Sequence, residues 1–377
     1  MIRPLVFTFS LLTVVAHPVL ADEPRNVAIL VYQGVELLDF AGPAEVLSVA
    51  GNGAFHVFTV GPTNEAIVSQ GFVRVVPNYS IEDSPRPAVI VIPGGGASAV
   101  YDDPRLMSWI KKNSARTELT MSVCDGAIVL ARAGLLEGLR ATTHWGAVGS
   151  LRQFPGVTVV PEARFVDTGH VLSTQGVSAG IDGALHVVQR FLGAEAAWSD
   201  AHYLMYPWEP AGLSRQEKSE LRPWIEQDWK SVEQIYGRKA KAEPGDPVIA
   251  TRLGVAQEEL GRHELAARTL QRALDLGSRD PNAFDDLASA CFELGRYDAA
   301  ARSYELEAPL RSALARPWVQ LRAARAWTRA GNKDAAIAAL EAATVNGAIG
   351  KHALESDADL AGLREDQRFR VLLERAR

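Results

Sequence analysis

The residue best suited to chemistry is Cys124, which stands where an apolar segment ends and small residues begin. The chain runs Met121-Ser122-Val123-Cys124-Asp125-Gly126-Ala127 and continues into a stretch rich in leucine and alanine. This order is typical of a nucleophile elbow, a strand-to-helix turn so tight that its neighbours must be small. The start of a helix favours the thiolate, because unpaired N–H groups lie there. We therefore expect a reactive thiol; a buried, inert cysteine is the alternative.

The carboxylate beside this thiol, Asp125, has three possible consequences. A negative charge next to the sulfur disfavours a second one, so Asp125 would raise the pKa of Cys124 unless it turns away or shares a proton. The same carboxylate could act as a general acid or base. It could also simply cap the helix that follows the elbow.

Other kinds of site receive no support from the sequence. The eight histidines show no ligand spacing with cysteines or acids, so we expect no metal and no other cofactor. The run Gly94-Gly95-Gly96 lacks the lysine and hydroxyl residue of a phosphate-binding P-loop. The second cysteine, Cys291, occupies a buried-type position in a later helical region, so we expect two separate thiols rather than a disulfide.

The segments that must position Cys124 alternate between strand and helix patterns from Asn26 to Leu192. Continuous apolar runs bounded by glycine or proline predict strands, and spacing of three and four predicts helices between them. The predicted strands cover 27–32, 55–60, 89–92 and 119–123, and the predicted helices cover 37–50, 103–115, 178–191 and 194–206. Because the strands are apolar throughout, both faces of the sheet must be covered. The fold class is α/β, with a parallel sheet between helices.

A different organisation begins after residue 206. Pro207, Pro210 and Gly212 break the chain, a helical stretch follows over 214–236, and the cluster from Glu243 to Pro247 is the clearest domain boundary. We therefore expect an α/β domain over 22–210, a helical linker over 211–246 and a further domain over 247–377.

This last region contains a repeat. Gly261 and Gly295 lie 34 residues apart, as do Ala266 and Ala300, and Gly331 follows 36 residues later. Such a period resembles the tetratricopeptide repeat, in which small residues let paired helices cross closely. We expect an all-α domain with two clear repeats, a degenerate third and a capping tail over 357–377, which binds a protein partner. Chance helical hairpins are the alternative.

The first residues indicate export. Arg3 precedes an apolar run, and Val19-Leu20-Ala21 resembles a signal-peptidase site, so we expect a signal peptide over 1–21 and a periplasmic or secreted protein. The apolar run is short for a membrane span, so none is expected after cleavage. A core strand or a retained anchor is the alternative.

Length and composition agree with a two-domain globular protein. The chain has 377 residues, of which 47% are apolar and 22% charged. A formal charge of −6 gives no reason to expect nucleic acid as a partner. Arginines do cluster between Arg311 and Arg329, but their helical spacing favours a solvated face.

Six motifs in a fixed order resemble the ThiJ/PfpI superfamily. The resemblance covers about Asn26 to Tyr206 and implies a flavodoxin-like fold similar to that of class I glutamine amidotransferases. Its branch contains isonitrile hydratases and the sensor domains of GlxA-type AraC regulators. The motifs are Gly34-Val35-Glu36-Leu37-Leu38-Asp39-Phe40-Ala41-Gly42-Pro43, Ile92-Pro93-Gly94-Gly95-Gly96, the cysteine elbow, Ala133-Gly134-Leu135-Leu136, Arg140-Ala141-Thr142-Thr143-His144-Trp145 and Gly180-Ile181-Asp182.

The resemblance implies roles for several residues. Cys124 takes the nucleophile position, and Asp39 takes the position of an acidic residue that approaches the sulfur and is implicated in catalysis in isonitrile hydratases. The N–H groups of Gly95 and Gly96, and those just after the cysteine at Gly126, would hold developing negative charge. Asp125 departs from the pattern, because hydratases of this branch usually have threonine there and other branches have histidine.

Two histidines invite a catalytic role, and we expect neither to have one. His144 lies in a motif that relatives without the amidotransferase triad retain, so a structural hydrogen bond is favoured over a catalytic base. With Gly95, Gly96 and Gly126, His144 is also a candidate to bind the substrate or its developing negative charge. His186 lies within the helix predicted over 178–191 and is expected to be packed or satisfied against the core.

Two functions remain open. In the first, the protein is a cysteine-dependent enzyme acting on a small electrophilic carbon, such as an isonitrile, nitrile or reactive carbonyl. In the second, it is a noncatalytic ligand sensor or stress-response scaffold whose repeats recruit a protein. A PfpI-like peptidase is disfavoured, because Asp125 replaces the histidine of that branch. Superfamily members commonly form dimers, so a homodimer is a further expectation from the resemblance.

Overall fold

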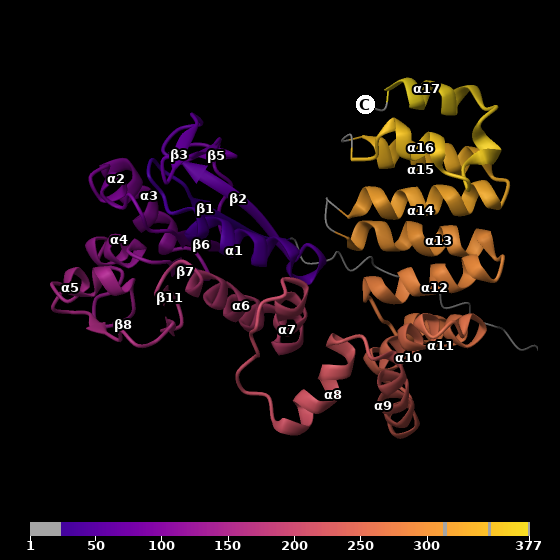
Figure 1. The fold of residues 1–377 in the computed structure, drawn as a ribbon, viewed down its shortest axis with the longest axis horizontal. Helices are drawn as coiled ribbons and strands as arrows, with labels where there is room; N and C mark the ends of the chain where they lie inside the picture. Colours follow the sequence, from indigo (N-terminus) through magenta and orange to yellow (C-terminus); the bar gives the residue numbers. More distant parts are fainter. Residues whose placement is uncertain (1–23, 312–314, 346–347, 376–377) are drawn as a thin grey trace, which may run out of the picture.

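The computed structural model describes residues 24–311, 315–345 and 348–375 (Figure 1). The predicted signal peptide over 1–21 therefore lies outside the described residues. Within them, no helix is long and apolar enough to span a bilayer.

The first part of the chain is built on one sheet of seven strands, in the order β10-β11-β7-β6-β1-β2-β5. Neighbouring strands are parallel except β10, which runs antiparallel to β11 at one edge. The strands are β1 (Arg25–Leu30), β2 (Phe55–Gly61), β5 (Tyr79–Ser80), β6 (Val89–Ile92), β7 (Leu119–Ser122), β10 (Phe165–Asp167) and β11 (Val171–Thr174). The parallel α/β sheet expected from the continuous apolar runs is confirmed.

Helices cover this sheet, and two small strand pairs lie beside it. Helices α1, α6 and α7 pack against one another, and α2 packs against α3 and α4. The helices are α1 (Leu37–Val49), η1 (Ala50–Asn52), α2 (Ser98–Tyr101), α3 (Pro104–Ser114), α4 (Gly126–Arg132), η2 (Trp145–Ala147), α5 (Val148–Leu151), α6 (Ala179–Leu192) and α7 (Ala194–Tyr203). The small pairs are β3 (Ile67–Ser69) with β4 (Val73–Val75), and β8 (Arg140–Ala141) with β9 (Thr158–Val159).

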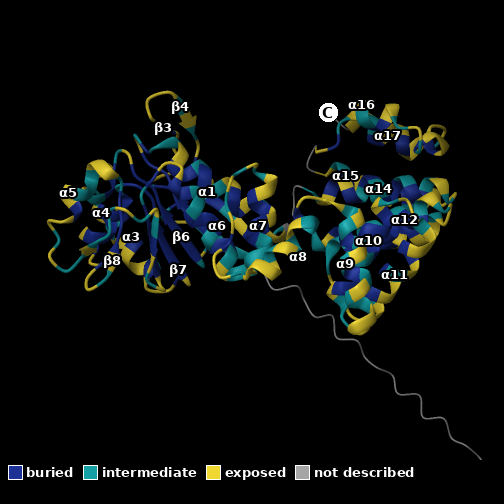
Figure 2. Ribbon diagram, turned by 60° about the horizontal axis from the view of Figure 1, so that its bottom comes forward, coloured by how far each residue is buried: buried dark blue, intermediate teal, exposed yellow. Residues whose placement is uncertain are grey.

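The central strands are buried along their length, which explains their uniform apolar sequence. Every residue of β6 and the last four residues of β1 are buried, and Figure 2 shows the sheet as the dark core of this part of the molecule. Each fully buried Val, Leu or Ile contributes roughly 1.5–3 kcal/mol relative to an exposed side chain. The sheet is thus a rigid platform for the loops at its edge.

The rest of the chain is helical. Helices α10 to α15 pack in sequence order and form the stack in Figure 1. The bounds are α8 (Arg215–Ile225), α9 (Trp229–Ala242), α10 (Pro247–Glu259), α11 (His263–Asp275), α12 (Pro281–Glu293), α13 (Tyr297–Glu307), η3 (Ala308–Leu310), α14 (Arg316–Arg329), α15 (Lys333–Thr344), α16 (Lys351–Ser356), η4 (Ala361–Leu363) and α17 (Gln367–Arg375).

The helical stretch predicted over 214–236 consists of two helices, α8 and α9. Gln227 adopts a φ of 57°, which a helix cannot continue through. The carboxylate of Asp228 then accepts a hydrogen bond from the N–H of Ser231 and starts α9. A polar periodic pattern does not reveal such a break.

Small residues do sit where the helices cross. A Cβ added to Gly254 would lie 2.5 Å from Cγ of Leu270, so α10 and α11 approach closely there. Ala266, Ala300 and Ala336 are fully buried. These contacts agree with the spacing that suggested a repeat, and the assignment to tetratricopeptide repeats stays a prediction, as do the domain boundaries.

An arginine links the α/β part to the helices. Arg252 of α10 forms an ion pair with Glu195 of α7, although only 12% of the arginine side chain is exposed. Its guanidinium also lies over the rings of Trp224 and Tyr236. The junction is therefore held by a specific, largely desolvated cation.

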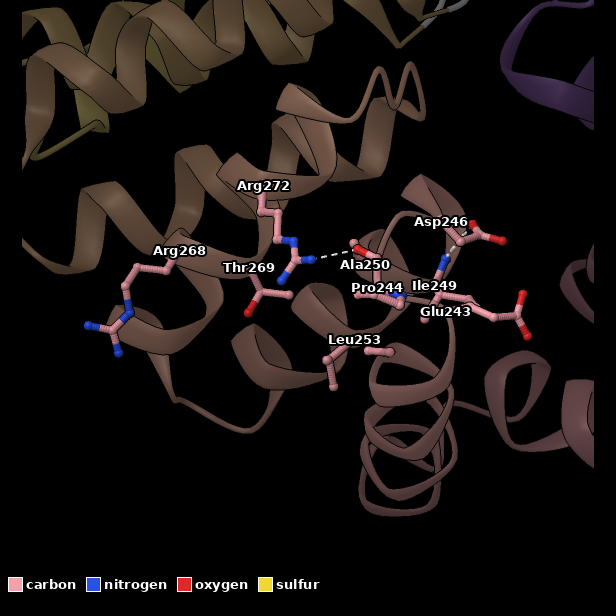
Figure 3. Close-up of a pocket in the computed structure, with 10 residues that line it drawn as sticks. Glu243, Pro244, Asp246, Ile249, Ala250, Leu253, Arg268, Thr269 and Arg272 are labelled. Atoms are coloured by element: carbon pink, nitrogen blue, oxygen red, sulfur yellow. Dashed lines mark hydrogen bonds between the residues drawn. The ribbon is translucent and has the colours of Figure 1, made fainter.

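Among the hollows on the surface of the described residues, two lie away from the elbow. One has a volume of about 220 Å³ and lies between α9, α10 and α11, where Arg272 donates to the backbone oxygen of Pro244 (Figure 3). The other, of about 450 Å³, lies beside α3 and includes Trp109 and Lys112. Neither is lined by Cys124 or Asp39.

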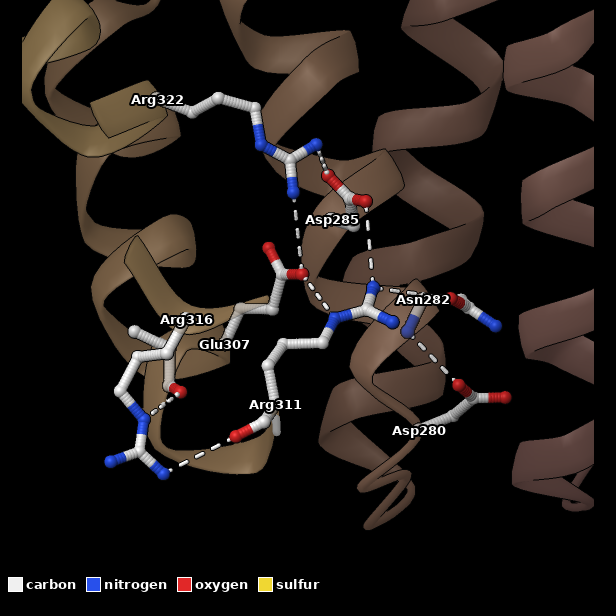
Figure 4. Close-up of polar contacts among 8 residues, drawn as sticks. Asp280, Asn282, Asp285, Glu307, Arg311, Arg316 and Arg322 are labelled. Carbon is white, nitrogen blue, oxygen red and sulfur yellow. Dashed lines mark hydrogen bonds and ion pairs between the residues drawn. The ribbon is translucent and has the colours of Figure 1, made fainter. Parts of the chain in front are cut away.

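Two arginines of the cluster near α14 do not lie on the solvated face that we expected. Arg311 and Arg322 both contact the fully buried Glu307, and both also pair with Asp285 (Figure 4). Only 13% of the Arg311 side chain is exposed. Helical spacing within α14 could not show that neighbouring helices supply acids, so the solvated-face prediction is wrong for these two residues.

Candidate active site

Cys124 lies in the turn between β7 and α4 and has a φ of 59°. A non-glycine residue rarely adopts this left-handed conformation, and such residues gather at functional sites. The side chain is only 9% exposed. The tight strand-to-helix turn predicted from the sequence is therefore present, with its sulfur near the surface of the core.

Glycines make room for this turn. A Cβ at Gly126 would lie 2.1 Å from the carbonyl oxygen of Ile92, and a Cβ at Gly176 would lie 3.0 Å from the sulfur of Cys124. Real Cβ atoms do not approach other atoms so closely without displacement. The small residues around the elbow are thus required by contact distances.

Asp39 lies beside the thiol, as the resemblance implied. It is fully buried in the first turns of α1, and its two oxygens accept hydrogen bonds from the N–H of Gly94 at 3.0 Å and of Val177 at 2.7 Å. Its carboxyl group also shares a hydrogen bond with the Cys124 thiol. Burial raises the pKa of Asp39 to about 6, although these hydrogen bonds act in the opposite direction.

The thiol itself is held in its protonated form. Burial raises the pKa of Cys124 well above its usual range, and the charges of Asp39 and Asp125 add to this effect. The backbone N–H of Asp125 points at the sulfur and opposes the shift without overcoming it. The expectation of a thiolate at the helix start is therefore wrong, because desolvation and two carboxylates outweigh the N–H groups.

The side chain of Asp125 does not cap α4, although the residue occupies the N-cap position. Its carboxylate instead accepts a hydrogen bond from the N–H of Gly95 at 2.8 Å. The capping alternative is thus replaced by a bridge from the elbow to the glycine turn after β6.

The backbone donors predicted for developing negative charge are engaged elsewhere. Gly96 donates to the carbonyl of Gly34 at 2.9 Å, and Gly126 donates to the carbonyl of Val123 at 3.0 Å. Gly95 donates to Asp125. Of these three, only the exposed Gly95 can be released by rotating a side chain.

His144 makes a local hydrogen bond, and its predicted part in substrate binding stays a prediction. Its Nδ1 accepts a hydrogen bond from the N–H of Gly146 at 3.3 Å and caps η2. The preceding residue, Thr143, is the one that reaches the elbow, since its hydroxyl donates to the carbonyl of Cys124 at 2.8 Å. His186 is satisfied by Asp167, with 2.8 Å between ring nitrogen and carboxylate.

Three contacts at the site were missed by the sequence reading. Val177 adopts a φ of 48° and presents its N–H to Asp39. Tyr32, two residues after the end of β1, is buried and donates to the carbonyl of Pro93 at 2.7 Å. Thr143 holds the elbow carbonyl. The position of Gly176-Val177 directly after β11 was the one available signal, because strand ends meet at one edge of a parallel sheet.

Among the described residues, no group of three or more His, Cys, Asp or Glu side chains is arranged to hold a metal ion. Cys124 and Cys291 are both free, buried thiols.

Comparisons with known proteins place the α/β part in a family. Residues 25–190 match the model of the DJ-1/PfpI family. The chain is 33% identical over 173 residues to an isonitrile hydratase of Pseudomonas putida, covering 46% of this chain and 74% of that protein. It is also 26% identical to a Parkinson disease protein 7 homolog of Danio rerio, covering 46% of this chain and 93% of that one.

More distant similarities extend to a regulator and to a solved structure. The HTH-type transcriptional regulator GbdR of Pseudomonas aeruginosa is 21% identical over 188 residues, which is 51% of its length. A ThiJ/PfpI family protein of Pseudomonas syringae aligns with a TM-score of 0.46 and 25% identity over 59% of this chain and 97% of its own. On the matched family model and the 33% identical relative, the chain belongs to the DJ-1/PfpI family.

Proposed function

We propose that the protein is a cysteine-dependent hydratase that adds water to a small electrophilic carbon, with isonitriles as the substrate class. The observation that carries this proposal is the pair of a strained elbow thiol, Cys124, and a buried carboxylate, Asp39, which share a hydrogen bond. The 33% identity to an isonitrile hydratase supports the choice of substrate.

In the first step Asp39 removes the thiol proton. With a pKa of about 6, this carboxyl is ionised at neutral pH and can accept that proton. The sulfur forms a bond to the isonitrile carbon, and the same carbon takes the proton from Asp39. The product is a thioimidate, in which carbon is bound to sulfur and hydrogen and doubly bonded to nitrogen, and Asp39 is again a carboxylate.

In the second step water adds across the carbon–nitrogen double bond. Asp125, the less buried of the two carboxylates that act on the thiol, takes a proton from the attacking water and passes it to nitrogen. As the carboxylate moves to do so, the N–H of Gly95 is released for the oxygen that forms. Breaking the carbon–sulfur bond then returns a proton to Cys124 and yields an N-substituted formamide.

Product formation tests this proposal directly. The full chain is incubated with an alkyl isonitrile at pH 7.5, and the formamide is quantified by proton NMR. We expect catalytic turnover, with many equivalents of formamide per protein. A chain that is folded by circular dichroism and yields none from isonitriles or dicarbonyls would contradict the proposal.

A noncatalytic sensor is the second candidate, and the site itself favours it in one respect. The donors at Gly95, Gly96 and Gly126 are all engaged, and the thiol is protonated. A sensor would bind isonitrile or a related ligand and show a raised melting temperature without product. Thermal shift measured beside the NMR assay therefore separates the two candidates.

The remaining proposals concern location and partners. We propose that residues 1–21 direct export to the periplasm or medium and that 247–377 form tetratricopeptide repeats that bind a protein partner. The 34-residue spacing and the close crossing at Gly254 support the repeats. A homodimer through the α/β domain is proposed from the family resemblance.

A further inference from the structure

Both side-chain charges that act on the Cys124 thiol are carboxylates. Asp39 lies fully buried beneath the site, whereas Asp125 is half-buried and bonded to the exposed Gly95. Asp125 is therefore the more solvent-exposed of the two carboxylates whose charges act on the sulfur.

The carboxylate of Asp125 is held in place rather than free in solvent. One oxygen lies 2.8 Å from the nitrogen of Gly95. A Cβ added to Gly94 would lie 2.0 Å from that same oxygen, which shows how closely the carboxylate packs on the glycine turn. The negative charge thus has a fixed position beside the thiol.

Apolar side chains accompany this charge. Val177, whose N–H binds Asp39, is 38% exposed, and Leu38, which directly precedes Asp39 in α1, is 36% exposed. The left-handed φ of Val177 is costly for a β-branched residue, and such strain persists where the surroundings enforce it. These residues offer an apolar surface next to Asp39.

From this arrangement we infer that Asp125 acts as a charge filter, so that the site accepts neutral, apolar electrophiles and rejects anionic ones. The inference rests on the proposed function in assuming that Cys124 reacts with electrophiles, and it narrows the substrate class to uncharged molecules.

The expected size of the effect follows from Coulomb repulsion. An anion about 5 Å from a fixed, partly desolvated carboxylate is disfavoured by about tenfold or more at low ionic strength. Salt at about 1 M shortens the screening length to about 3 Å and should remove much of this discrimination.

Two alkylating reagents test the filter without requiring turnover. Iodoacetamide and iodoacetate react at the same kind of carbon: a sulfur–carbon bond forms, iodide leaves and the thiol proton passes to base. They differ in charge, because iodoacetamide carries a neutral amide and iodoacetate carries a carboxylate. The ratio of their rates at Cys124, measured by mass spectrometry of the peptide, is independent of the thiolate fraction because both reactions draw on the same thiol.

The comparison uses the full-length protein, Asp125→Asn and the control Asp102→Asn, which removes an equal charge at an exposed position of the same domain. Free N-acetylcysteine supplies the intrinsic ratio. We expect the wild-type ratio of iodoacetamide to iodoacetate to exceed that of free thiol by about tenfold and to fall at least about fivefold in Asp125→Asn, with no change in Asp102→Asn.

A ratio in Asp125→Asn equal to that of wild type would overturn the inference. Should that variant fail to fold, wild type alone decides: a ratio that falls severalfold between low salt and 1 M salt supports the filter, and a ratio equal to that of free thiol at both overturns it. Failure of isonitrile turnover with the ratio intact would count against the hydratase and not against the filter.

Discussion

Replacing Cys124 by alanine is expected to abolish formamide production, with a loss of at least about a thousandfold. The sulfur forms the covalent bond on which both steps depend, and alanine retains the small size that the elbow requires. The NMR assay with an alkyl isonitrile measures the loss, and circular dichroism checks the fold.

The matched control is Cys291→Ala. This second thiol is 6% exposed and lies on α12 in the helical part. Turnover should be unchanged, apart from any effect of a small cavity on stability. Substantial formamide production by Cys124→Ala would mean that water is activated without the sulfur, and the covalent mechanism would fail.

Replacing Asp39 by asparagine is expected to lower turnover by about a hundredfold to ten-thousandfold, the usual range for a general base. The amide keeps the shape of the side chain and cannot accept the thiol proton. In wild type, the carboxylate form is lost as the pH falls through its pKa of about 6, so turnover should rise between pH 5 and pH 7 with a midpoint near 6.

The control for this pH dependence is Asp200→Asn. Asp200 is another buried acid, whose pKa burial alone raises to about 7, and it lies on α7. We expect Asp200→Asn to keep the rise in turnover and Asp39→Asn to lose it. If the midpoint moves in Asp200→Asn and not in Asp39→Asn, the rise in turnover reports Asp200, and our assignment of it to Asp39 is wrong.

The sheet and the elbow could be predicted from sequence because each depends on local pattern. Uniformly apolar runs require two covered faces, and a nucleophile between a strand and small residues requires a tight turn. The approach of Asp39 to Cys124 came instead from the family resemblance. No spacing in the sequence predicts that the first turn of α1 lies close in space to the end of β7.

The donor groups could not be predicted, because their partners depend on the path of the backbone. Gly95 adopts a φ of 96° and pairs with Val35 in an isolated bridge, which brings the N–H of Gly96 to the carbonyl of Gly34. The same turn aims the N–H of Gly95 at Asp125. Sequence shows glycines at such a turn and not the directions of their N–H groups.

The protonation of the thiol was misjudged for a related reason. A helix start lowers a thiol pKa, but here burial of Cys124 and the negative charges of Asp39 and Asp125 raise that pKa by more. The sequence correctly warned of the charge on Asp125. It carried no measure of burial, which is the largest of the effects.

The central claim is that Asp39 accepts the proton of the Cys124 thiol. Its most direct test is the rate at which iodoacetamide alkylates Cys124 between pH 5 and pH 9. Cys124 and Asp39 are coupled through a shared proton. The alkylation rate should therefore follow the fraction of protein molecules in which this pair carries one proton. The account predicts a rise with a midpoint near 6 and a plateau above pH 7, both lost in Asp39→Asn. A rate that climbs steadily with pH and is identical in Asp39→Asn, or no alkylation of Cys124 at any pH, would contradict it.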